Sequence, residues 1–117
     1  MRSIANQFKP DSTFVNQHDY FVWPSLLCIG DEPCPMYERS WSVHNAVTKA
    51  HLTDLLNRSD IQSTLNGTCT PKSGAIGYTS LCETTYTSKG YQVSIAYDTV
   101  ASDRTKDVIM LRVIKNE

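Results

Sequence analysis

The spacing of hydrophobic residues changes near residue 69, so the two parts of the chain predict different elements. In the first part, residues 42–57 contain good helix formers and neither Gly nor Pro, and Ser40 or Ser42 is suited to cap a helix start. One stripe at helical spacing consists of Val43, Ala46, Val47 and Ala50. A second group, on the opposite side, consists of Leu52, Leu55 and Leu56. This pattern predicts a helix that is buried on both sides or bends near His51.

From residue 69 onward the pattern changes to that of β-strands, and part of it alternates with the period of two that half-buried strands show. Extended segments are predicted at 75–78 and 81–86, and residues 87–90 suit a four-residue hairpin loop. Residues 107–115 follow a polar turn at 101–106 and are apolar on both faces, which is typical of a central strand. The clearest alternation runs through Tyr91, Val93, Ile95 and Tyr97.

The remaining segments are shorter and less regular. Residues 1–13 are mostly polar and predict an irregular arm, whereas residues 20–23 are bulky and apolar and predict an extended segment. Residues 60–65 predict a short helical turn that ends at Asn66-Gly67. We therefore expect one α+β domain over residues 1–117, with one or two helices followed by a three- to four-stranded antiparallel meander.

Four cysteines fall into two short loops that each contain turn formers. They stand at positions 28, 34, 69 and 82, and loop length favours disulfides between Cys28 and Cys34 and between Cys69 and Cys82. A zinc site is the alternative, but structural zinc sites pair cysteines two to four residues apart, and here five and twelve residues intervene. The fold is therefore expected to carry two short disulfide loops, and no metal or cofactor.

Disulfides place a protein in an oxidising compartment, so we expect an extracytoplasmic location, periplasmic or secreted. The first seven residues lack the apolar run of a signal peptide, which leaves three explanations: a trimmed leader, a larger exported parent, or cysteines that are reduced thiols. No stretch approaches the 18 apolar residues of a membrane span. Net charge is −1 and the Lys and Arg residues are scattered, which argues against a general nucleic-acid binder.

Aromatic residues bracket the first cysteine loop, where they suit either the core of a small domain or a contact surface for another protein. Tyr and Trp are favoured at interfaces because they bury a large area with few torsions to freeze. The residues concerned are Trp23, Tyr37 and Trp41. The favoured hypothesis is an extracytoplasmic protein-binding module, such as an inhibitor, an immunity-type protein or a recognition domain.

The alternative hypothesis is the catalytic domain of an exported antibacterial toxin, most plausibly a metal-independent ribonuclease with RNA as its partner. Cleavage through the 2′-hydroxyl needs a general base, a cation for the developing charge and a hydrogen-bonding hydroxyl. The candidate bases are His18, His44 and His51, the cations Lys72 and Arg104, and the hydroxyls Thr79, Ser80 and Tyr97. A third hypothesis is a cytosolic protein with four buried or zinc-bound thiols.

Overall fold

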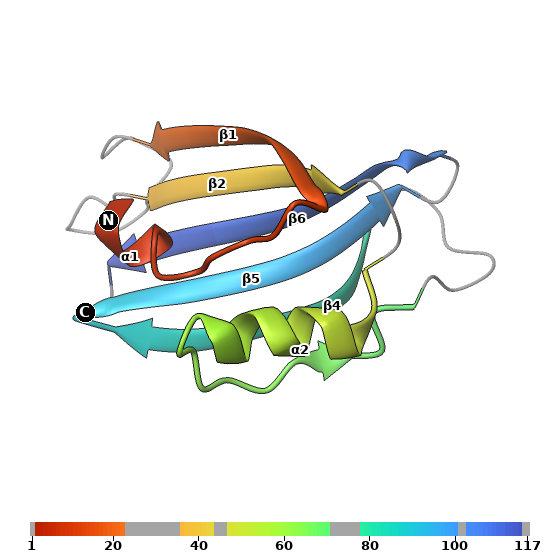
Figure 1. Cartoon of the computed structure of the whole chain (residues 1–117). Coiled ribbons are helices and arrows are strands. Elements are labelled where there is room, and N and C mark those ends of the chain that lie inside the picture. Colours follow the sequence, from red (N-terminus) through yellow and green to blue (C-terminus); the bar gives the residue numbers. More distant parts are fainter. Residues whose placement is uncertain (1, 23–35, 44–46, 71–77, 101–102, 116–117) are drawn as a thin grey trace.

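One antiparallel sheet of six strands contains most of the described residues (Figure 1). The structure is a computed structural model, and it describes residues 2–22, 36–43, 47–70, 78–100 and 103–115. Its elements are α1 (Arg2–Ala5), β1 (Phe14–Val22), β2 (Met36–Val43), α2 (Lys49–Arg58), β3 (Asn66–Gly67), β4 (Tyr78–Ser88), β5 (Tyr91–Val100) and β6 (Asp103–Lys115).

The strand order across the sheet is β1-β2-β6-β5-β4-β3, and every neighbouring pair is antiparallel. The last three long strands form the meander that the alternation predicted. Two strands from the first part of the chain, β1 and β2, extend the sheet beyond β6. As predicted, the strand over residues 107–115 is central, because β6 pairs with β2 on one side and β5 on the other.

The expected fold class is therefore wrong: the fold is β-rich, with six strands and two short helices, rather than helices followed by three or four strands. The largest error lies at residues 42–57. The strand β2 continues to Val43, and α2 begins only at Lys49, after Thr48, whose side chain accepts a hydrogen bond from the His51 amide at 3.1 Å. Only the leucine side of α2 is buried. Of the predicted first stripe, Val43 belongs to β2, Val47 is buried before the helix begins and Ala50 is exposed on it.

Three smaller predictions also differ from the structure. Within residues 1–13, a short helix forms and Ile4, Ala5 and Phe8 are buried in the core. Residues 60–65 form no helix, and Asn66-Gly67 pairs with β4 as the strand β3 instead of stopping a helix. The hairpin loop between β4 and β5 has two residues, Lys89 and Gly90, rather than the predicted four. Their φ angles of 50° and 82° suit a tight two-residue turn.

The hydrophobic core lies between one face of the sheet and the two helices. Figure 1 shows α1 and α2 on the same side of the sheet. Every second residue of the central strands points to this inner face, including Tyr97, Ile109 and Leu111, which are 0% exposed. Phe8 and Phe14 pack on Trp41, with ring centroids 5.6 Å and 5.7 Å from its ring. The predicted alternation of residues 91–97 is confirmed, since Val93, Ile95 and Tyr97 are buried and the residues between them are not.

Candidate functional site

A disulfide bond between Cys69 and Cys82 ties the segment after β3 to the strand β4. This pairing was predicted and is confirmed, and it excludes a zinc site built from all four thiolates. The other predicted pair, Cys28 and Cys34, lies outside the described residues. Within the described ranges, neither helix combines the length and the apolar character that a membrane span needs.

Two of the three aromatic residues predicted for a contact surface belong to the interior. Tyr37 is 4% exposed and Trp41 is 2% exposed, and both point to the inner face from β2. The indole N–H of Trp41 donates to the Gln17 side-chain oxygen at 3.1 Å, so its polar atom is satisfied as well. Trp23 lies outside the described residues. These rings pack the core, and the residues that sequence reasoning missed lie on β1.

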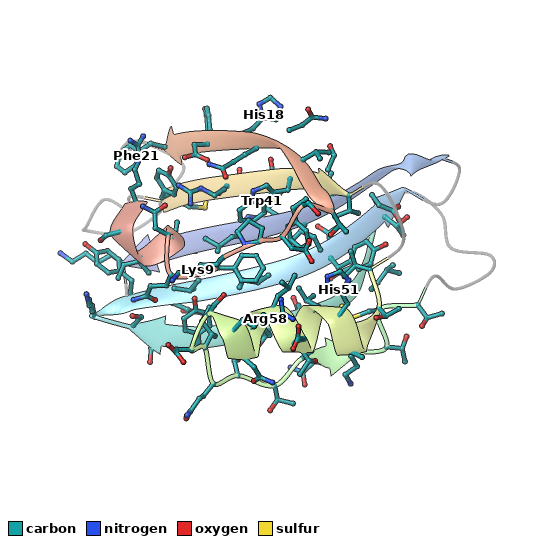
Figure 2. The ribbon with its side chains drawn as sticks, viewed as in Figure 1. Lys9, His18, Phe21, Trp41, His51 and Arg58 are labelled. Atoms are coloured by element: carbon teal, nitrogen blue, oxygen red, sulfur yellow. A yellow bond between two sulfur atoms is a disulfide. The ribbon has the colours of Figure 1, made fainter. Side chains whose placement is uncertain are left out.

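The exposed large hydrophobic residues of the described chain are Tyr20 and Phe21, which are 64% and 38% exposed. They are consecutive on β1, so their side chains lie on opposite faces of the sheet. Tyr20 pairs with Glu38 and Phe21 pairs with Tyr37, which places Phe21 on the inner face at the rim of the core. Figure 2 shows Phe21 at the far end of β1, away from the helix α2.

β1 is an edge strand, because among the described residues it pairs with β2 alone. Its first half is irregular: the register shifts between Val15 and His18, and Asn16 has a φ of 55°. From His18 to Val22 the pairing with β2 is regular. The regular half of the edge therefore carries both exposed aromatic residues.

An ion pair beneath this edge holds β1 in place. The Arg39 guanidinium is buried and donates to both carboxylate oxygens of Asp19, at 2.9 Å and 3.0 Å. It also donates to the Asn6 side chain at 2.7 Å, which links the end of α1 to the sheet. The Tyr37 hydroxyl donates to Asp19. The Arg39 hydrogen bond is the main cause that lowers the pKa of Asp19 below its ordinary value, although burial alone would raise it.

The described candidates for a ribonuclease site lie on different sides of the sheet. His18 is exposed and pairs with Ser40 on the outer face, and Figure 2 shows it pointing away from the body. His51 lies on α2 and contacts the Asp11 carboxylate, with 2.6 Å between Nε2 and Oδ2. Ser80 is exposed on β4 and donates to Asp98, whose pKa is raised because burial outweighs this hydrogen bond.

Tyr97, the remaining described candidate, belongs to a buried polar group rather than to an accessible site. Its hydroxyl donates to the Asp107 carboxylate at 2.8 Å and accepts a hydrogen bond from the Val47 amide at 3.4 Å. Thr99 donates to the other oxygen of Asp107, and all three side chains are at most 3% exposed. A fixed hydrogen-bond network of this kind satisfies polar groups in a core.

The other members of the proposed set are not described at side-chain level. His44 and Lys72 lie outside the described residues. Thr79 belongs to β4 and Arg104 to β6, but their side chains lie outside the described part of the structure. The candidates with described side chains are divided between the outer face of the sheet, the helix α2 and the buried core, so they do not form one catalytic set.

No family model matches this chain, and neither curated proteins nor solved structures include a significant match. The function must therefore be inferred from the arrangement of its own residues.

Proposed function

We propose that this protein is an extracytoplasmic protein-binding domain, and that it receives an extended segment of its partner along the outer edge of β1. The observation that carries this proposal is the position of Tyr20 and Phe21. They are the large hydrophobic side chains exposed in the described chain, and they project to opposite faces from a strand edge that no other described strand pairs with.

An unpaired edge is a template for another strand, because alternate backbone N–H and C=O groups point away from the sheet. Proteins usually protect such an edge with Pro, Lys, a bulge or a covering segment. The irregularity at Asn16 protects only the first half of β1. The second half, His18-Asp19-Tyr20-Phe21-Val22, contains neither Pro nor Lys, and its one acidic side chain is neutralised by Arg39.

The chemistry on either side of this edge describes the segment that would fit. On the outer face, Tyr20 stands beside Glu38, which accepts a hydrogen bond from Arg112 at 2.6 Å and so presents no free charge. On the inner face, Phe21 extends the apolar rim of the core. A partner strand that pairs here would place an apolar side chain against each ring and would contain no Pro. Backbone hydrogen bonds would supply affinity, and the two rings would supply selectivity.

The Cys69–Cys82 disulfide supports the extracytoplasmic part of the proposal, since disulfides persist in oxidising compartments. The toxin ribonuclease has less support. Its described candidate histidines lie on opposite sides of the sheet, and Tyr97 is buried and hydrogen-bonded in the core.

The test is selection of peptides from a displayed random library on the full chain, followed by chemical-shift mapping of the best peptide. We expect extended, Pro-free peptides whose shifts centre on residues 18–22. The variant Tyr20→Lys places a charge on the edge and should weaken binding at least about fivefold, the effect of losing an interface anchor.

The matched control is Thr85→Lys. Thr85 is exposed on the outer face and belongs to the same cross-strand row as Tyr20, but it lies on β4, toward the other edge. Equal losses in the two variants, a shift map centred elsewhere or the absence of enriched peptides would contradict the proposal. A concentration-dependent dimer that Tyr20→Lys abolishes would contradict a separate partner and identify the occupant as a second copy.

A further inference from the structure

A hollow of about 480 Å³ lies on the helix side of the sheet, far along the strand order from the β1 edge. Three segments meet there: Gln7 after α1, residues 59–62 after α2, and residues 86–88 at the end of β4. The volume falls within the range of about 300–1,000 Å³ typical of small-molecule sites. We call this space the Tyr86 hollow.

The Tyr86 hydroxyl is the buried side-chain polar atom of the described chain that has no hydrogen-bond partner. Tyr86 packs on the core from the inner face of β4, and it also lines the hollow. Burial raises the pKa of Tyr86 to about 12, so the hydroxyl keeps its proton at every physiological pH. A buried donor without an acceptor costs free energy, so its presence in a folded protein calls for an explanation.

The lining of the hollow selects a chemical class of ligand. Gln7 and Gln62 provide amides, and Ser88 provides a hydroxyl that already accepts a hydrogen bond from Gln7 at 3.1 Å. Asp60 is the charged residue of the lining, and its carboxylate would repel an anion. A Tyr ring, two amides and one carboxylate together suit a neutral molecule with many hydroxyl groups and an apolar ring face.

We propose that the Tyr86 hollow is a binding site for a neutral saccharide, a hexose or a short hexose oligomer. The sugar ring packs on the wall formed by Tyr86, and its hydroxyls donate to the Asp60 carboxylate. Entry of the sugar shifts the flexible glutamine side chains of the lining and brings a sugar oxygen within reach of the Tyr86 hydroxyl, which then gains its acceptor. This site is independent of the peptide edge at β1.

The test is an NMR titration of the full chain with glucose, galactose, mannose, N-acetylglucosamine and their common disaccharides at millimolar concentration. We expect at least one of them to shift the amides of residues 59–62 and 86–88. Glucose 6-phosphate is the charged comparison, and it should bind more weakly than glucose because of Asp60.

The decisive variant is Tyr86→Phe, which removes only the hydroxyl. It should weaken saccharide binding up to about tenfold, the factor that one hydrogen bond supplies. It should also raise the melting temperature of the free protein, because the buried donor without a partner is gone. Tyr91→Phe is the matched control: Tyr91 packs on the same core from β5 but does not line the hollow, so saccharide binding should stay unchanged.

The combination of weaker binding and higher free-protein stability separates a ligand site from a merely structural tyrosine. If none of these saccharides shifts the residues of the hollow, or if Tyr86→Phe binds as well as the wild type, the proposal is overturned. A fall in melting temperature for Tyr86→Phe would also overturn it, because the hydroxyl would then have a partner within the free protein.

Discussion

The two edges of this sheet are built differently. At one edge, the two-residue strand β3 pairs with β4, and the Cys69–Cys82 disulfide ties the segment after β3 to the same strand. Ser63 adds a side-chain hydrogen bond to Thr84. At the other edge, β1 has nine residues and no described neighbour on its outer side.

This difference separates the stabilised edge at β4 from the edge at β1, to which we assign partner binding in our proposal. Edges attract other strands, and proteins protect the edges they do not use. Here the β4 side has covalent and backbone protection, whereas the regular half of β1 has an exposed aromatic residue on each face.

The largest effect should come from removing the disulfide on the protected side. The double variant Cys69→Ala/Cys82→Ala opens a loop with a sequence separation of 13, and it should lower the free energy of unfolding by about 3 kcal/mol. Urea denaturation measures this loss. An unchanged urea midpoint would show that the stability of the β4 edge does not depend on the Cys69–Cys82 disulfide.

The next effect concerns the ion pair under β1. Asp19→Asn keeps the shape but removes the negative charge that pairs with Arg39 and accepts a hydrogen bond from the Tyr37 hydroxyl, and it should cost about 1.5–3 kcal/mol at pH 7. Because the folded state lowers the pKa of Asp19, its stabilisation is present above the unfolded value near 3.8 and is lost as the pH falls through the folded value. The difference between wild type and variant should therefore shrink below about pH 4, and a constant difference from pH 7 to pH 2 would contradict this role.

Two glycine variants compare a crowded position with an open one. A Cβ at Gly67 would lie 2.5 Å from the Leu81 backbone oxygen, and the φ of Gly67 is +100°. Gly90 has a φ of +82°, but a Cβ added there would meet no atom within 4 Å. Gly90→Ala should cost about 1–2 kcal/mol through its backbone conformation alone. Gly67→Ala should cost more, and thermal unfolding of the two variants should rank them in this order.

The smallest effect on stability should come from the β1 edge itself. Tyr20 is 64% exposed, so Tyr20→Lys should change the free energy of unfolding by less than about 0.5 kcal/mol. The same variant should lose peptide binding, which would separate the binding role from any packing role. A large loss of stability would show that Tyr20 supports the fold instead.

Prediction from the sequence succeeded where the apolar residues of a single strand show which of its positions are buried. In β5 and β6 the inner positions are apolar without exception from Val93 to Tyr97 and from Ile109 to Val113, so alternation alone identifies these strands. In β2 the alternation is disguised, because the inner position between Tyr37 and Trp41 is the charged residue Arg39.

That charge is tolerated only because Asp19 comes from a strand about twenty residues earlier, and local patterns do not reveal such pairing. The same limit explains why local patterns did not distinguish the exposed Tyr20 from the buried aromatic residues. Tyr20, Tyr37 and Trp41 look alike as aromatic residues near the first cysteine loop. Their burial depends on which strand is the edge and which face the helices cover, and both are decided by long-range packing.

The most direct test of the central claim is amide hydrogen exchange of residues 18–22, measured with and without the selected peptide. In the free protein, the alternate amides of β1 that point away from β2 should exchange rapidly, and the bound peptide should protect them while β4 stays unchanged. Outward amides of β1 that are already slow in the free protein, or that stay fast in the complex, would contradict the account.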